Sequence, residues 1–406
     1  MAMAGSETAK RMMAERIGAL DGLRGLMALL VLVAHYFGEV AHGFHGLAVA
    51  WIAVVMFFAL SGFVVGRLIL EHAGKPGFAL PFYMRRACRT LPAYILWVLL
   101  LGIAGIALHG SAYADARLTF PLTSYLTFTQ TLWMVAEGDV GSRWLVPTWT
   151  LTVEQQFYLV APALLLLVPR GKLVPVLATV AGISILFRAS IYWGGALPDL
   201  AALVMLPGSV DALLAGLIAA AVLRSAPEAR PSTLLRATPV VLLVVAAILK
   251  LADPLGLRLF EVLGPSVVAV ACGTYILSIA LGAPEAARLQ SSGLRFLGRV
   301  SYSLYLSHLA VLGLLHGLLL HAEPDIGTWA QLAVTLAAVP ASIAVAWVSW
   351  RLVEMPFQQL GQQWSWNGGE RNVPRAEAGF AALRDTWHRA ARLPSWRLPA
   401  GTGLAR

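Results

Sequence analysis

Three ionisable side chains stand within otherwise apolar segments of the sequence: Arg24, His35 and Glu154. Arg24 and His35 are 11 residues apart, so on a helix they differ by about 20° in direction and about 16 Å in depth. A buried carboxylate or imidazole is costly unless it has a partner. We therefore predict that His35 and Glu154 form a hydrogen-bonded pair; a histidine that packs against a neighbouring helix is the alternative interpretation of His35.

Histidine is the side chain best suited to proton transfer near neutral pH, because its unperturbed pKa is about 6.5. It can take a proton from a hydroxyl group, or act as a nucleophile, when an acid orients its ring. We therefore interpret His35, Glu154 and Arg24 as catalytic residues. The sequence leaves open whether His35 is a general base or a covalent carrier.

A basic cluster of Arg85, Arg86 and Arg89 lies just before an apolar run that begins at Leu91. Guanidinium groups match the geometry of phosphate oxygens and can bind them through two hydrogen bonds. We predict that these three arginines bind the phosphates of a cofactor or co-substrate. The alternative is that they only orient the segment in a membrane or contact lipid headgroups.

Several further polar and aromatic residues could line a substrate site. Ser301, Tyr305 and His308 fall at helical positions i, i+4 and i+7, so they form one polar stripe that can face the bundle interior. Trp149, Tyr158 and Tyr302 are the other predicted lining residues. The pair Ser61 and Gly62 permits close helix approach.

Other acids have simpler interpretations. Asp211 and Glu261 are expected near helix ends, as caps or rim charges. Glu354-Met355-Pro356 is expected to end the last helix, because proline disfavours the helical conformation of the residue before it.

The elements that must position these residues are membrane-spanning helices. Of the 406 residues, 58% are hydrophobic and only 13% charged, whereas soluble proteins carry about 25% charged residues. The sequence contains a series of long apolar runs, and a membrane span requires roughly 20 mostly apolar residues. The sequence predicts an all-α bundle of ten helices, at residues 23–41, 47–70, 91–109, 149–168, 173–188, 204–223, 238–252, 261–281, 300–320 and 328–353.

The distribution of charge predicts the orientation of the bundle. Lys and Arg gather in alternate loops, including the N-terminal stretch and the cluster at Arg86, whereas acids such as Asp139 and Asp325 gather on the other side. By the positive-inside rule, both termini are expected in the cytoplasm. The net charge of +9 follows from this topology, so a nucleic-acid partner is not expected. Cys88 and Cys272 indicate no disulfide framework, and no metal site is expected.

Two segments do not fit simple hairpins. Residues 110–148 contain prolines and tryptophans, and we expect a re-entrant or interfacial lid, with a loose loop as the alternative. The tail, residues 358–406, is rich in arginine and carries Phe380, Leu383, Trp387 and Ala391 at helical spacing. We predict a helix on the inner membrane surface there, with a disordered basic tail as the alternative.

Taken in order, these segments resemble the acyltransferase-3 family of membrane O-acyltransferases, whose members acylate bacterial surface polysaccharides, Nod factors and macrolides. The resemblance extends from about Leu20 to Phe357, so residues 1–357 are expected to form the membrane domain. It rests on Arg24 and His35, on the Arg-x-x-Arg element at Arg86 and Arg89, on Glu154, and on the Ser-Tyr-x-x-Tyr-Leu-x-His element from Ser301 to His308.

The resemblance implies an acyl-CoA donor, with acetyl-CoA favoured, bound from the cytoplasmic side, and no tightly bound cofactor. The expected acceptor is a hydroxyl of a glycan, a lipid-linked sugar or a related molecule at the membrane, here the bacterial inner membrane. Val55 replaces an aspartate that many relatives carry before the Phe57-Phe58 pair, which puts in doubt any mechanism requiring that acid. The appended hydrolase-like domain of some relatives is also expected to be absent.

Two other classes of protein fit the composition. A proton-coupled transporter or flippase could use Arg24, His35 and Glu154 as a relay, although two repeated halves with broken helices are missing from the sequence. A structural scaffold of a polysaccharide-export complex would leave the buried ionisable groups without a purpose. Acyl transfer is therefore the favoured function.

Overall fold

The computed structural model describes residues 2–45, 51–108, 118–364 and 366. Within them, ten helical segments are long and apolar enough to cross a membrane, which confirms the predicted number. The helices that carry these segments are α1 (Ala2–Phe37), α2 (Trp51–His72), α3 (Ala79–Ala107), α6 (Thr148–Leu167), α7 (Leu173–Tyr192), α9 (Leu206–Ser225), α10 (Thr233–Leu251), α11 (Leu259–Ala280), α12 (Ser292–Leu320) and α13 (Trp329–Ser349). The predicted surface helix between Phe380 and Ala391 lies outside the described residues.

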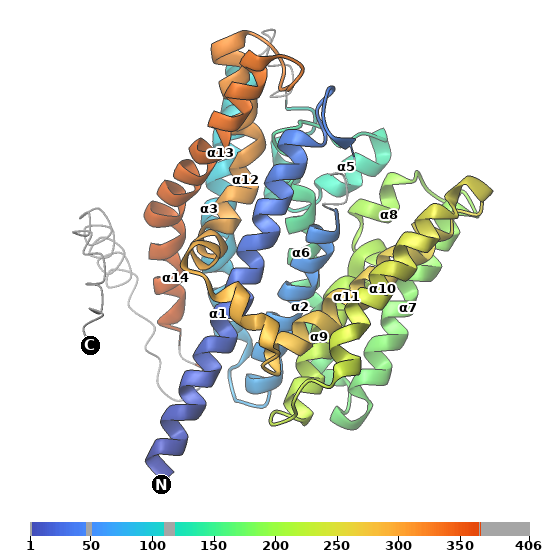
Figure 1. Ribbon diagram of the computed structural model, residues 1–406, viewed down its shortest axis with the longest axis vertical. Coiled ribbons are helices and arrows are strands. Elements are labelled where there is room, and N and C mark those ends of the chain that lie inside the picture. Colours follow the sequence, from blue (N-terminus) through green and yellow to red (C-terminus); the bar gives the residue numbers. More distant parts are fainter. Residues whose placement is uncertain (1, 46–50, 109–117, 365, 367–406) are drawn as a thin grey trace, which may run out of the picture.

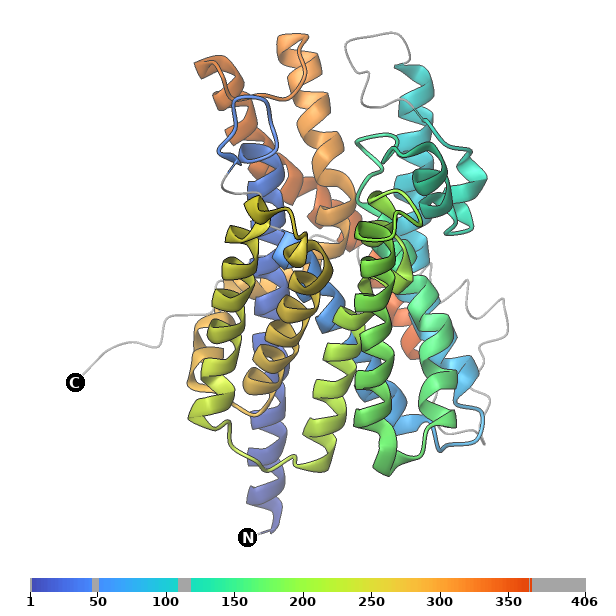
Figure 2. The ribbon, with the colours of Figure 1, turned by 90° about the vertical axis from the view of Figure 1, so that its right-hand side faces the viewer.

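The bundle has two flanks (Figure 1). Helices α3, α12 and α13 form one flank, α7, α9, α10 and α11 form the other, and α1, α2 and α6 lie between them. Figure 2 shows the second flank face on, with its four helices running nearly side by side. The functional residues predicted from the sequence lie on the central helices and on the flank formed by α3 and α12.

Glycines allow the central helices to approach their neighbours closely. A Cβ added at Gly62 of α2 would lie 1.8 Å from the carbonyl oxygen of Leu213 on α9, and one at Gly216 would lie 1.8 Å from that of Ala59. The predicted role of Gly62 in close helix packing is therefore confirmed. A similar contact joins α1 to α12, where a Cβ at Gly25 would lie 2.0 Å from the carbonyl oxygen of Leu294.

Helix α3 begins at Ala79, well before the predicted start at residue 91. The arginine cluster therefore lies on the helix and not in a loop before it. Long basic side chains are tolerated there because they can extend toward polar surroundings while their aliphatic stems stay packed.

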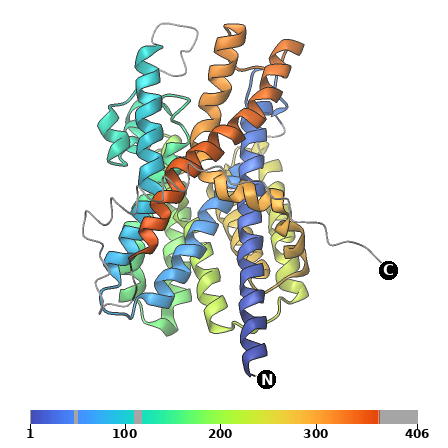
Figure 3. The same cartoon turned by 90° about the vertical axis from the view of Figure 1, so that its left-hand side faces the viewer.

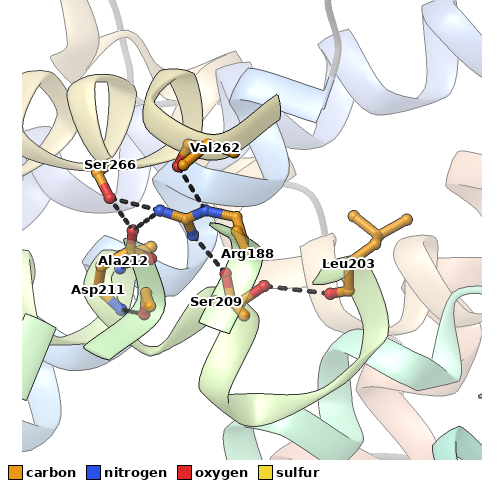
Figure 4. Close-up of polar contacts among 9 residues, drawn as sticks. Arg188, Leu203, Ser209, Asp211, Ala212, Val262 and Ser266 are labelled. Carbon is orange, nitrogen blue, oxygen red and sulfur yellow. Dashed lines mark hydrogen bonds and ion pairs between the residues drawn. The ribbon is translucent and has the colours of Figure 1, made fainter. Parts of the chain in front are cut away.

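The predicted end of the last helix at Glu354 is wrong. After α13 the chain makes a π-helical turn, Trp350–Glu354, and continues as α14 (Met355–Gln362), which packs against α3. Pro356 stands in the first turn of α14, where its missing N–H has no helical partner to lose. Figure 3 shows this composite helix crossing the bundle obliquely.

The segment between α3 and α6 is packed, so the loose-loop alternative does not hold for its described part, residues 118–147. It forms two short helices, α4 (Leu122–Leu126) and α5 (Gln130–Glu137). Tyr125, Gln130, Met134 and Trp144 are at most 2% exposed. Their packing makes this segment a fixed cover over the end of the bundle near α6 and α8 (Leu200–Val204).

Candidate active site

One pocket gathers most of the predicted site residues. We call it the arginine pocket, and helices α1, α2, α3, α6 and α12 form its walls. Its polar and aromatic lining consists of Arg24, Phe57, Phe58, Ser61, Arg86, Arg89, Thr90, Thr150, Glu154, Tyr158, Ser301, Tyr302 and Tyr305.

Glu154 is the centre of the charge network in the arginine pocket. Ser61 Oγ donates a hydrogen bond to Glu154 Oε1 at 2.6 Å, and Tyr158 Oη donates one to Oε2 at 3.0 Å. Arg24 and Arg86 lie close enough to interact with the Glu154 charge, and the Arg86 guanidinium lies over the Tyr158 ring at 5.4 Å. One carboxylate thus faces several guanidinium groups, so the pocket carries net positive charge.

His35 lies in a different place and has a different partner. Its Nδ1 is 2.8 Å from Nε2 of His308 on α12, and the two rings stack with centroids 5.0 Å apart. On the other side of the ring, His35 Nε2 is 3.5 Å from Oε2 of Glu39. His308 itself is 1% exposed.

The surroundings of His308 determine which ring nitrogens carry protons. His308 Nδ1 lies 2.9 Å from the carbonyl oxygen of Tyr305 and 3.1 Å from that of Leu304. A carbonyl oxygen can only accept, so His308 Nδ1 carries the proton and its Nε2 accepts from His35 Nδ1–H. In the neutral pair, His35 Nε2 is then left with a free lone pair, as a base or nucleophile requires.

His35 and Glu39 both line a second pocket, which we call the histidine pocket. Its polar and aromatic lining consists of His35, Glu39, Trp51, Phe58, Trp149, Ser209, Asp211 and Tyr305. Burial raises the pKa of Glu39, and the charge of Arg143 opposes that rise. Glu39 therefore holds a proton more readily than an exposed carboxylate does.

A thin wall separates the two pockets. Val54, Phe58 and Tyr305 line both of them. Thr150 donates a hydrogen bond to the Tyr305 hydroxyl at 3.1 Å, which fixes this ring in the wall. A molecule that enters the arginine pocket must therefore pass these three side chains to reach His35.

The predicted hydrogen bond between His35 and Glu154 is wrong. Glu154 lies in the arginine pocket with Arg24, whereas His35 is about 16 Å further along α1. The arginines neutralise the carboxylate, and His308 supplies the partner that His35 needs. Of the six predicted lining residues, Trp149 lies in the histidine pocket, Tyr158, Ser301 and Tyr302 lie in the arginine pocket, and Tyr305 lies in both. His308 lines neither pocket, because it is buried behind His35.

Arg85 does not join the arginine pocket. Its Nε donates to the carbonyl oxygen of Trp364 at 2.9 Å, its Nη2 donates to that of Gln362 at 3.1 Å, and its guanidinium lies over the Trp366 ring. Adjacent residues on a helix point about 100° apart, so Arg85 faces the segment after α14 while Arg86 faces the pocket.

Glu354 was predicted from the sequence only as a helix end and not as a residue near the site. This side chain is 2% exposed, and its Oε1 accepts a hydrogen bond from the backbone N–H of Ser303 at 3.1 Å and another from the Ser303 hydroxyl. Its charge interacts with Arg24 and Arg89 across the bundle. An acidic residue at the end of a long apolar run could have indicated a buried polar site. Pro356, two residues later, indicated a helix end instead.

Known proteins are similar to this chain in sequence. A family described as "Acyltransferase domain" matches residues 17–351. A Staphylococcus aureus (strain COL) protein named "Putative O-acetyltransferase" is 24% identical over 380 residues, which are 85% of this chain and 58% of the relative. A Komagataeibacter xylinus protein named "Putative membrane-bound transacylase" is 32% identical over 169 residues, 37% of each chain.

The chain spans less than two thirds of the length of the S. aureus relatives that it matches. No solved structure matches it. The family match nevertheless covers most of the chain, from the helix that carries His35 to the π-helical turn. The protein therefore belongs to the acyltransferase 3 family.

Proposed function

We propose that the protein is a membrane O-acyltransferase that moves an acyl group, with acetyl favoured, from acyl-CoA to a hydroxyl of a glycan or related acceptor. The observation that carries the proposal is the hydrogen bond between His35 and the buried His308, which orients His35 in the lining of a pocket that shares a wall with a second, arginine-lined pocket. The names of the relatives, an O-acetyltransferase and a transacylase, support the class of reaction.

The arginine pocket is the proposed donor site. Arg86 and Arg89, on one face of α3, and Arg24 on α1 would hold the phosphates of CoA. Arg86 is 9% exposed and already rests on Tyr158, so it is pre-positioned for an anion. The pantetheine arm would then pass Phe58 and Tyr305 toward His35.

The histidine pocket is the proposed acceptor site. Trp51 and Trp149 offer flat apolar faces of the kind that suit a sugar ring, and Glu39 and Ser209 offer polar groups. In the general-base route, His35 Nε2 takes the hydroxyl proton while the hydroxyl oxygen bonds to the thioester carbon. The carbon–sulfur bond then breaks, and the CoA sulfur leaves with the proton from the imidazolium.

A covalent route uses the same atoms in two steps. His35 Nε2 attacks the thioester carbon, the carbon–sulfur bond breaks, and CoA leaves as its thiolate. The acceptor hydroxyl oxygen then bonds to the acyl carbon, the carbon–nitrogen bond breaks, and the hydroxyl proton is released, to balance the CoA thiolate as thiol. The two routes differ in one observable: only the covalent route releases CoA thiol in a burst and leaves label on the protein before an acceptor is added.

The experiment is acyl transfer by purified protein with acetyl-CoA labelled in the acetyl group and a panel of glycans, followed by thiol release and by label in the acceptor. We expect both signals in the wild-type protein and neither in His35→Ala, with His45→Ala, an exposed histidine beyond α1, as the control. Thiol release and transfer at wild-type rates in His35→Ala would rule out the proposed role of His35. Thiol release that continues over many turnovers, with no label in any acceptor or on the protein, would indicate hydrolysis alone.

A further inference from the structure

An apolar groove lies between α1, α2, α10 and α11, and it shares no lining residue with the two pockets. It has a volume of about 480 Å³, and its lining includes Leu30 and Ala34 of α1, Val240 and Leu243 of α10, and Cys272 and Tyr275 of α11. Leu30 is 45% exposed and Val240 is 64% exposed. All four helices carry membrane-spanning segments, so hydrocarbon is the natural content of the groove.

One end of the groove carries a pair of opposite charges. Arg236 lies in the first turn of α10, and Glu285 lies in the 3₁₀ turn Pro284–Gln290 that links α11 to α12. Both line the groove. Arg236 Nε donates to Glu285 Oε1 at 3.0 Å, and Arg236 Nη2 bonds the same oxygen.

The second carboxylate oxygen of Glu285 has no hydrogen-bond partner among the described residues. This atom, Oε2, is itself buried, whereas the Glu285 side chain as a whole is 37% exposed. The Arg236 hydrogen bond holds the pKa of Glu285 below its usual value, so the carboxylate is ionised at neutral pH. The groove thus ends in one positive and one negative group, at the level where an apolar helix begins and lipid headgroups are expected.

We propose that this groove binds a phospholipid whose headgroup carries both a phosphate and a primary ammonium group, as phosphatidylethanolamine does. Its acyl chains would lie along α1 and α10, its phosphate would pair with Arg236, and its ammonium would donate to Glu285. A phosphatidylglycerol headgroup has no cation for Glu285, and a phosphatidylcholine headgroup has no N–H to donate. Charge complementarity therefore selects the ethanolamine headgroup.

The headgroup is tested by native mass spectrometry of the full-length protein, taken from nanodiscs that contain equal amounts of phosphatidylethanolamine and phosphatidylglycerol. We expect the wild type to retain phosphatidylethanolamine in about 2- to 5-fold excess, the range for half-exposed charge contacts. Glu285→Gln should reverse this preference, because Arg236 is then the remaining charge. Asp199→Asn breaks the exposed ion pair with Arg258 elsewhere on the surface and should leave the preference unchanged.

The position of the acyl chains is tested with a matched pair of variants on α10. Val240 lines the groove, whereas its neighbour Val241 is 57% exposed and does not line it. Val240→Trp should lower the amount of retained phospholipid, and Val241→Trp should not. Equal retention by these two variants, or an unchanged headgroup preference in Glu285→Gln, would overturn the proposal.

Discussion

Two stacked histidines with different tasks are the central feature at the scale of single residues. The backbone carbonyls of Tyr305 and Leu304 fix the proton on His308 Nδ1, and His308 in turn fixes the proton on His35 Nδ1. The tautomers of both histidines are therefore set by backbone carbonyl groups of α12, which do not titrate. Under the proposed function, His308 is a positioning residue, and Glu154 lies apart from it in the arginine pocket.

Replacing His308 by phenylalanine should remove the acceptor for His35 Nδ1–H while keeping a flat ring at the site. We expect kcat to fall, by at most the roughly 10²- to 10⁴-fold that a well-placed base supplies, with the Kd for acyl-CoA unchanged. Glu154→Gln should show the opposite pattern, with weaker acyl-CoA binding and a smaller effect on kcat. Steady-state kinetics and acyl-CoA binding are measured for both variants. A fall in kcat for Glu154→Gln with no change in acyl-CoA binding would contradict the assignment of Glu154 to the arginine pocket and favour a role beside His35.

Arg86 and Arg85 offer a matched comparison, because adjacent arginines face different surroundings. Arg86→Ala should raise the KM for acyl-CoA on the order of 10- to 100-fold, since a charge-assisted hydrogen bond contributes about 1.5–3 kcal/mol. Arg85→Ala should leave the KM unchanged, because Arg85 binds the backbone after α14. Equal KM values for the two variants would mean that the arginine pocket does not hold the donor.

The composition of the site was easier to predict than its pairings. Ionisable groups in apolar segments stand out in a sequence, so Arg24, His35 and Glu154 could be identified. Their partners could not, because helix rise fixes depth only along one helix and says nothing of the depth at which α6 sits beside α1. The structure settles this by placing Glu154 beside the arginines.

At the scale of helices, the contact between α2 and α9 positions Ser61 for Glu154. Gly62→Ala should drive α2 and α9 apart, because its Cβ would lie 1.8 Å from the Leu213 carbonyl oxygen. Such overpacking costs about 1–3 kcal/mol and should lower the thermal unfolding temperature. Gly182→Ala on α7 is the control, because a Cβ there meets nothing within 4 Å; similar losses in both variants would argue against a special contact.

The loop after α1 is joined to the loop between α12 and α13 by His42 and Asp325, whose Nδ1 and Oδ2 are 2.6 Å apart. Burial alone would raise the pKa of Asp325, but hydrogen bonds from the His42 backbone N–H and imidazole lower it overall. A lowered pKa gives stability that is present above the unfolded pKa of about 3.9 and is lost as the pH falls through the folded pKa.

Asp325→Asn should therefore lower the unfolding temperature at pH 7, and this difference from the wild type should shrink as the pH falls below about 3.9 and vanish once Asp325 of the folded wild type is protonated. Tryptophan fluorescence melts at several pH values measure this. Glu323→Gln, an exposed change in the same loop, controls for charge alone. A difference between wild type and Asp325→Asn that is independent of pH would exclude the ion pair as its cause.

Hydrophobic length sufficed to predict ten spans, because lipid requires about the same number of apolar residues in each. Helix ends were harder to predict. The arginines at positions 85, 86 and 89 were predicted to lie before the helix, although they lie within α3. In the sequence, Pro356 indicates the end of the last helix. The chain instead continues through a π-helical turn into α14, which begins at Met355.

At the scale of the whole molecule, the predicted orientation places both termini in the cytoplasm. After replacement of Cys88 and Cys272, which are both buried, single cysteines at Glu323 and Gly171 would lie on opposite ends of the bundle. An impermeant thiol reagent added to intact cells should label Glu323→Cys and not Gly171→Cys. The reverse labelling would invert the orientation and place the arginine pocket on the outer side.

The wall of Val54, Phe58 and Tyr305 has a consequence for the energy stored across the membrane. Arginines and a carboxylate approach this wall from one end of the bundle, and two histidines and Glu39 approach it from the other. An unbroken file of such groups would conduct protons, and each elementary charge that crosses 100 mV dissipates about 2.3 kcal/mol. Val54 and Phe58 neither give nor accept a proton, and the Tyr305 hydroxyl is held by Thr150. We therefore expect the wall to interrupt such a file and to limit proton leakage between the two pockets.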